Sequence, residues 1–215
     1  GSISISGRGG DGGIDAKGYQ TGVKVAGSIV GGSAGQLSVK GLGGSSANIV
    51  NAGVDISGKI TSTGASISIE ALAGPANTYY GIGLRMPFGG EVRAGGTGDL
   101  TVKAAGAGDS CCKHDAVELR GGSALTTASG DVRLELESGP GSVGLAARDD
   151  WEIGSATGDL DLTDAVLSVA SGSLLGDVQF QTEAKLQVNF DGETVNSLGF
   201  AGSIDLTGLQ LDIAG

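Results

Sequence analysis

The most concentrated reactive chemistry in the chain is the segment Cys111–Asp115, which holds both cysteines and the only histidine. Cysteine, histidine and aspartate can all bind zinc, so Cys111, Cys112, His114 and Asp115 form a candidate metal site. A cysteine nucleophile assisted by His114 is a second interpretation, although the sequence places no residue to orient the histidine. Adjacent cysteines rarely ligate one tetrahedral ion, and no other cysteine pair exists. We therefore favour a third interpretation, a surface loop with free thiols or a vicinal disulfide.

Aspartates recur at one position of a sequence repeat. They are Asp99, Asp131, Asp159 and Asp177. If the repeats stack as parallel strands, these carboxylates lie about 4.8 Å apart and repel one another unless a cation or basic groups intervene. Calcium takes six to eight oxygen ligands, so the row is a candidate calcium site. We expect no cofactor, and calcium is the one alternative that this row leaves open. The glycine-rich nonapeptide repeat of calcium-binding β-helices is absent, and we favour a solvated acidic face.

Loops of variable length and content precede the second strand of each repeat, and they carry polar and aromatic residues. The residues expected along this edge are Gln20, Asn51, Tyr79, Tyr80, His114 and Arg148. Insertions on one face of a repeat protein are common binding sites, so this edge is a candidate surface for sugar or protein contacts. The alternative is loop sequence without selected contacts. Trp151 falls at a position that is aliphatic in the other repeats, so we expect it in the core or at an end cap.

Two further motifs are set aside. Gly7–Gly12 matches the spacing of the dinucleotide-binding fingerprint, but a chain with 43 glycines matches it by chance and no helical pattern follows. A flat face of Thr-x-Thr repeats would indicate ice binding, and only Thr61-Ser62-Thr63 fits that pattern.

The elements that position all these candidates form a repeat of about 31 residues. Its unit is a small residue followed by alternating aliphatic residues, and it starts at Gly1, Gly35, Ala65, Gly98, Gly130, Gly158, Gly176 and Gly202. A second alternating run follows in the long units, at Val23–Val25, Val54–Ile56, Ile82–Leu84, Val117–Leu119 and Trp151–Ile153. A shorter third run lies around Ile29–Val30, Ile60, Val92 and Leu125. Alternation at period two predicts half-buried strands, and three strands per unit with glycine at the corners predict an all-β parallel β-helix, or β-solenoid.

Stacked turns should place compatible side chains beside one another. The sixth position of the repeat reads Ser6, Lys40, Glu70, Lys103, Glu135 and Thr163, with charges that alternate in sign. The same stacking places Arg133 beside Asp161 and Lys24 beside Asp55. Opposite charges across a ladder contribute about 0.2–1 kcal/mol each, and a slip of one residue would turn these side chains to the wrong face. The pattern therefore predicts parallel strands in register.

The composition narrows the function classes. The 215 residues include 43 glycines and 3 prolines, and the formal net charge is −11. The excess of acidic over basic residues argues against a protein that binds nucleic-acid phosphates or an anionic lipid surface. Both ends lie within strand patterns, so we expect a segment of a longer chain. The spacing divides it into regular long coils over 1–157 and shorter, less regular coils over 158–215.

The repeats resemble those of large secreted bacterial proteins. Residues 53–69, GVDISGKITSTGASISI, are similar to repeats of filamentous-haemagglutinin-like adhesins, and residues 184–211 are similar to the C-terminal repeats of autotransporter passengers. The resemblance implies a right-handed β-helix, a secreted or cell-surface location in a bacterium, and a role in adhesion or as a surface stalk.

We therefore expect a structural or adhesive module rather than an enzyme. Its expected partners are a cell-surface glycan or protein, or further copies of the chain end to end, without nucleic acid and without membrane insertion. The alternative is a β-helix that binds or cleaves polysaccharide, which requires a cleft where carboxylates and basic groups converge.

Overall fold

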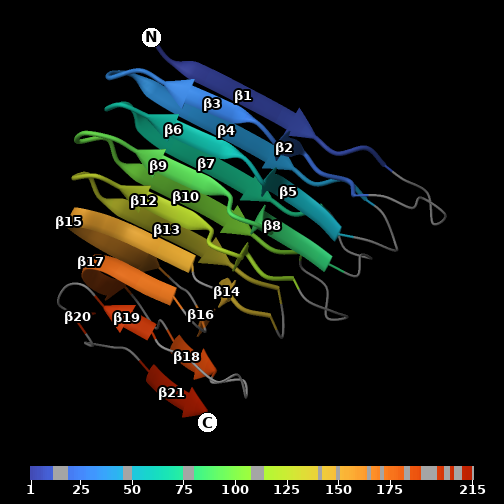
Figure 1. The fold of residues 1–215 in the computed structure, drawn as a ribbon. Coiled ribbons are helices and arrows are strands. Elements are labelled where there is room, and N and C mark those ends of the chain that lie inside the picture. Colours follow the sequence, from blue (N-terminus) through green and yellow to red (C-terminus); the bar gives the residue numbers. More distant parts are fainter. Residues whose placement is uncertain are drawn as a thin grey trace.

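The computed structural model describes residues 1–11, 19–45, 50–74, 80–107, 114–139, 142–148, 151–163, 166–169, 172–181, 185–189, 198–200, 204–205 and 210–214. The fold is all-β: over these ranges the chain forms strands and turns and contains no helix. It follows that none of the described segments is a helix able to cross a membrane. Figure 1 shows the strands stacked one above another from the N-terminus at the top to the C-terminus at the bottom.

The strands belong to two parallel sheets. The eight-stranded sheet has the order β2 (Val23–Val25), β5 (Val50–Ile56), β8 (Tyr80–Met86), β11 (Val117–Arg120), β14 (Leu145–Arg148), β16 (Val166–Val169), β18 (Lys185–Asn189), β21 (Gln210–Ala214). The 13-stranded sheet has two wings. One wing is β1 (Ile3–Arg8), β4 (Gln36–Leu42), β7 (Ser66–Leu72), β10 (Leu100–Ala105) and β13 (Val132–Glu137). The other is β3 (Ser28–Gly31), β6 (Lys59–Ser62), β9 (Glu91–Ala94) and β12 (Ala124–Thr127).

The long strand β15 (Trp151–Thr163) joins the two wings. Its first part pairs with β12 and its last part pairs with β13. Beyond it, β17 (Gly172–Gln181) pairs with β15, and the short strands β19 (Leu198–Phe200) and β20 (Ile204–Asp205) pair with β17. Each early turn thus gives one strand to each wing and one to the eight-stranded sheet. The predicted parallel β-solenoid with three strands per turn is confirmed.

The predicted register of the first strand is confirmed along the whole stack. Its first aliphatic residues pair turn by turn in the order Ile3, Leu37, Ile67, Leu100, Val132, Leu160, Val178 and Ile204. The column of alternating charges is also in register, from Ser6 through Lys40, Glu70, Lys103 and Glu135 to Thr163. Within it, Lys40 Nζ lies 2.8 Å from Glu70 Oε1, and Lys103 Nζ lies 3.7 Å from Glu135 Oε2. Arg133 pairs in register with Asp161, and Lys24 with Asp55, as predicted.

The core is a column of aliphatic side chains that the stacked strands enclose. Residues such as Leu37, Ile67, Leu100 and Val132 are at most 1% exposed. No single turn could bury this row, because each turn covers only its neighbours, so the core depends on stacking. Trp151 is 2% exposed, and its expected place in the core is confirmed.

The predicted alignment of the second strand is wrong in two repeats. Val54 pairs with Leu84, not Ile82, so the third repeat is displaced by two residues. In the fifth repeat the second strand is β14, while Trp151–Ile153 belongs to the third-strand position, where Ile153 pairs with Leu125. A shift by two leaves the alternation of inward and outward residues unchanged, so alternation by itself could not detect it.

A glycine directly precedes the aliphatic run of the second strand, at the point where this strand passes close to the first strand. A Cβ atom on Gly53 would lie 2.4 Å from the backbone N and 2.5 Å from the backbone O of Leu72. Gly22 and Gly83 hold the equivalent position in the neighbouring turns, since Val23, Val54 and Leu84 follow them in register. The close approach of two backbones explains the glycine at this column.

Candidate functional site

The corrected register creates a charged row on the outer face of the eight-stranded sheet. The row reads Lys24, Asp55, Arg85, Glu118 and Ala146 from β2 to β14. Arg85 therefore lies between two carboxylates, one on the strand before it and one on the strand after it. The four charged members alternate in sign, and the row ends on the small side chain of Ala146.

Arg85 joins this row into an ion-pair network. Its Nη1 lies 3.1 Å from Asp55 Oδ2, and its Nε lies 3.3 Å from Glu118 Oε2. Arg120 Nη2 lies 2.6 Å from the other oxygen of Glu118, Oε1. The side chains of Asp55, Glu118 and Arg85 are 8%, 13% and 20% exposed, so water screens these pairs only in part. The Arg85 guanidinium also lies over the ring of Tyr19, 5.4 Å from its centre.

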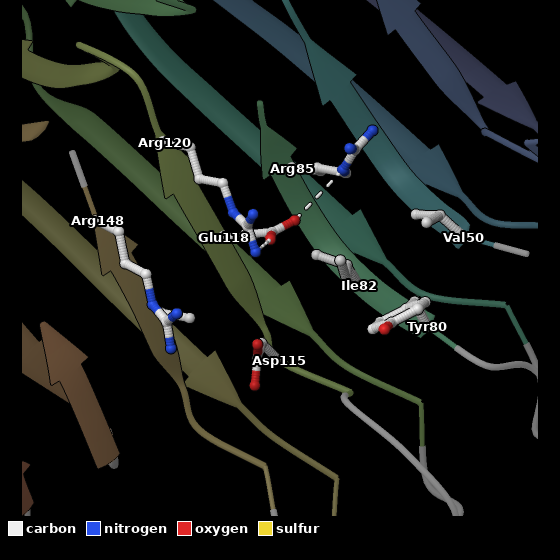
Figure 2. A pocket seen from close by; sticks show the side chains of 9 residues that line it. Val50, Tyr80, Ile82, Arg85, Asp115, Glu118, Arg120 and Arg148 are labelled. Carbon is white, nitrogen blue, oxygen red and sulfur yellow. Dashed lines mark hydrogen bonds and ion pairs between the residues drawn. The ribbon is translucent and has the colours of Figure 1, made fainter. Parts of the chain in front are cut away.

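A hollow of about 270 Å³ opens next to this network. Its lining residues are Val50, Tyr80, Ile82, Arg85, Asp115, Glu118, Arg120, Ala146 and Arg148. Figure 2 shows Glu118 near the middle of the group, joined by dashed lines to Arg85 and Arg120, with Arg148 on one side and Tyr80 on the other. Ala146 follows Glu118 in the row and lines the hollow, and its small side chain leaves more space there than a longer side chain would.

Arg148 differs from the other two arginines of the hollow. It is exposed at the end of β14 and pairs in register with Arg120, so two guanidinium groups extend from neighbouring strands. Arg85 and Arg120 both contact Glu118, whereas Arg148 forms no ion pair within the described ranges. Like charges opposite each other in a ladder are destabilising, so this position favours an anion.

His114 and Asp115 are buried beneath this surface and connect neighbouring turns. His114 Nδ1 accepts a hydrogen bond from the backbone N–H of Gly81 at 3.0 Å. The backbone N–H of His114 donates to Ser142 Oγ at 2.7 Å. Asp115 Oδ1 accepts from the backbone N–H of Val143 at 3.1 Å. Both side chains therefore help to satisfy backbone groups of the adjacent turn.

The predicted metal or nucleophile site includes residues outside the described ranges. Cys111 and Cys112 fall there, so their pairing with His114 and Asp115 stays a prediction. Among the described residues, there is no cluster of three or more histidine, cysteine, aspartate or glutamate side chains that could hold a metal ion. The described half of the segment, His114 and Asp115, makes the inter-turn hydrogen bonds given above.

The row of aspartates forms a hydrogen-bonded ladder. The Oδ1 atom of Asp99 accepts the backbone N–H of Asp131 at 3.0 Å, and Oδ1 of Asp131 accepts that of Asp159 at 3.0 Å. One turn earlier, Ser66 Oγ accepts the backbone N–H of Asp99 at 3.1 Å. Each side chain thus binds the strand of the next turn, and this explains why acidic residues recur at a spacing where they repel. Asp177 pairs in register with Asp159, so its backbone continues the row, and calcium binding at the row stays a prediction.

The residues of the predicted ligand-binding edge lie in different environments, and ligand binding at this edge stays a prediction. Tyr80 and Arg148 line the hollow, and Tyr80 is 43% exposed. Asn51 and His114 are wrong as contact residues, because both are completely buried. Gln20 is half-buried and does not line the hollow, while Tyr79 lies outside the described residues.

The sequence prediction missed three charged residues of this surface, Arg85, Glu118 and Arg120. Alignment of the third repeat on Ile82 leaves Arg85 out of the charged row, so the sequence prediction contains no row that reaches Glu118. A signal was present in the chain: a glycine directly precedes the aliphatic run at Gly22, Gly53 and Gly83. Aligning those glycines restores the alternation of charge from Lys24 to Glu118.

Comparison of the chain with protein-family models, with curated proteins and with solved structures finds no match in any of the three.

Proposed function

We propose that this chain is an extracellular structural or adhesive module of a cell-surface adhesin, stalk or filament. The observation that carries the proposal is the unbroken parallel pairing of the eight-stranded sheet from β2 to β21. Such a stack grows by about 4.8 Å for each turn and keeps the same residues on the same face. It is therefore suited to hold a contact surface at a fixed distance and orientation. The resemblance of residues 53–69 to adhesin repeats supports the same role.

The outer face of the eight-stranded sheet is the contact surface that we propose. Over β2, β5, β8, β11 and β14 this face carries the charged row and the hollow, while the inward residues of these strands are packed in the core. A polar, partly aromatic surface of this kind fits a cell-surface glycan or protein. Substitution of the outward residues would change the binding partner. The inward residues that hold the stack, and with them the fold, would stay the same.

A polysaccharide-cleaving β-helix is the second candidate, and the hollow favours it because carboxylates and arginines converge there. Both carboxylate oxygens of Glu118 are engaged by guanidinium groups, and Asp115 accepts a backbone N–H. A general acid or base must be able to reach the substrate and exchange its proton. These contacts favour binding of a saccharide over its cleavage.

An adhesion assay with a parallel activity assay tests the proposal. The chain is coupled to beads, and bead retention under flow is measured on epithelial cells, on bacterial cells and on glycan-coated glass. Beads with an unrelated acidic protein of the same net charge are the control. We expect retention above the control on at least one surface and no release of reducing sugar from neutral or acidic polysaccharides. Retention equal to the control on every surface, or sugar release, would overturn the proposal.

A further inference from the structure

We infer that the hollow on the eight-stranded sheet binds a sugar that carries a carboxylate, such as a hexuronic acid, and that Arg148 binds this carboxylate. The inference deepens the proposed function, on which it rests, by naming the class of ligand for the proposed contact surface. It is carried by the charges around the hollow, by their pairing and by the nature of the remaining lining residues.

The pairing of charges leaves one cation available for a ligand. Arg85 is held by Asp55 and Glu118, and Arg120 is held by Glu118. Arg148 lines the same hollow, is exposed and makes no ion pair with any residue that the structure describes. It also lies opposite Arg120 in the ladder. An anion bound between these two guanidinium groups would relieve their repulsion.

A second hollow of about 240 Å³ provides a contrast on the wing that contains β7, β10 and β13. Its two cations, Lys103 and Arg133, both pair with Glu135, at 3.7 Å and 3.3 Å. Both cations that line this second hollow are therefore paired with a carboxylate. The difference in pairing, rather than the presence of arginine, distinguishes the hollow next to Arg148.

The surrounding charges favour a single carboxylate over a dense polyanion. A guanidinium group matches the planar carboxylate through two parallel N–H···O bonds. Asp115 and Glu118 stand in the same lining, and the whole chain carries a net charge of −11. A heavily sulfated chain would be repelled by these negative charges, whereas one carboxylate can contact Arg148 and leave them at a distance.

The remaining lining suits the rest of a sugar ring. Tyr80 presents an exposed ring, and Val50 and Ile82 add apolar surface beside it. Each oxygen of the Glu118 carboxylate holds one ion pair and keeps a further lone pair that can accept a hydrogen bond from a sugar hydroxyl group. The volume of about 270 Å³ is just below the range of roughly 300–1,000 Å³ for drug-sized ligands, as expected for a small ligand.

Binding of monosaccharides to the intact chain tests this inference. Glucuronate and galacturonate are titrated by NMR, with glucose and galactose as their neutral counterparts and acetate as the carboxylate alone. We expect both uronates to bind at least tenfold more tightly than the neutral sugars and than acetate. Chemical shifts should move at Tyr80 and at the strand end that holds Arg148.

Variants identify the residue responsible. Arg148→Gln should weaken uronate binding at least tenfold, and Arg148→Lys should restore part of it, because lysine keeps the charge and loses the planar pair of donors. Arg93→Gln is the matched control: Arg93 is also exposed and also lacks an ion pair within the described part of the chain, but it lies on β9 outside the hollow. This variant should bind uronate as the unaltered chain does. Circular dichroism and fluorescence of the single tryptophan, Trp151, check that each variant is folded.

Four results would overturn the inference: equal binding of neutral sugars, equal binding of acetate, tighter binding of a sulfated oligosaccharide, or uronate binding that survives Arg148→Gln. Its failure is distinguishable from failure of the proposed function. Beads that adhere without any uronate binding would leave the adhesive role in place and remove this site. Uronate binding by a chain that adheres to no surface would keep this site and remove the adhesive role.

Discussion

Replacing Arg85 with methionine should destabilise the fold far more than a comparable change at an exposed ladder pair. Arg85→Met keeps most of the aliphatic stem and removes the guanidinium that joins Asp55 to Glu118. Both carboxylates are largely shielded from water, with side chains that are 8% and 13% exposed. Each would lose a cationic partner and remain in a partly desolvated position.

The magnitude follows from the geometry. Asp55 and Glu118 lie one strand on either side of Arg85, so they are separated by about two strand spacings, or about 9.6 Å. At an effective dielectric constant of about 20, their unshielded repulsion is about 1.7 kcal/mol. Removing one partner of a buried pair costs about 3–5 kcal/mol. Because Glu118 keeps Arg120 and Arg85 is itself 20% exposed, we expect a loss of about 2–4 kcal/mol in the free energy of unfolding.

Urea unfolding followed by Trp151 fluorescence and by circular dichroism measures this loss. Lys40→Met is the matched control, because Lys40 also bridges neighbouring turns, but its side chain is 58% exposed and its partner Glu70 is 36% exposed. Such a pair contributes about 0–1 kcal/mol. The triple variant Asp55→Asn, Arg85→Met, Glu118→Gln should recover most of the lost stability, since no unpaired carboxylate then remains in the row. The reasoning is refuted if Arg85→Met lowers the free energy of unfolding by no more than Lys40→Met does.

Three further changes test the contacts between turns. Asp131→Ala removes the acceptor for the backbone N–H of the next aspartate and should cost about 1 kcal/mol in urea unfolding, while Asp131→Asn, which keeps an acceptor, should stay near the original stability. His114→Ala leaves the buried N–H of Gly81 without its acceptor and opens a cavity, so we expect a loss of about 2–4 kcal/mol in the free energy of unfolding. Hydrogen exchange at Gly81 should also become faster, and unchanged exchange would contradict the assigned hydrogen bond. Gly53→Ala places a Cβ atom 2.4 Å from a backbone atom of β7 and should lower the melting temperature, whereas Gly27→Ala meets nothing within 4 Å and should leave it unchanged; equal melting of both variants would count against the close approach.

The first strand of each turn could be predicted because two independent signals agreed. The aliphatic residues alternate, and the outward charges at Lys40, Glu70, Lys103 and Glu135 alternate in sign from turn to turn. Alternation fixes which side chains face inward, and the charge column fixes which residues are neighbours. Together the two signals are compatible with a single register between turns, and the strands pair in that register in the structure.

The second strand could not be aligned in the same way, because its alternation allows more than one solution. Ile82, Leu84 and Met86 are all apolar and stand at every second position, so a shift of two residues exchanges one apolar residue for another. In the fifth repeat, the alternation of Leu145–Arg148 is weak, and the stronger pattern around Trp151 was placed in the wrong strand. The glycine before the aliphatic run, at Gly22, Gly53 and Gly83, carried the missing information for the third repeat, since it marks where two backbones meet.

The sequence by itself determined the type of strand, the spacing of the turns and the composition of the core, because these follow from local alternation repeated along the chain. The tertiary structure decided which outward residues meet. It buried Asn51 and His114 between turns, placed Arg85 between two carboxylates, and left a hollow where Ala146 follows Glu118. The physical reason is that these features depend on the register between turns and on the paths that connect them, and an alternating pattern within one strand specifies neither.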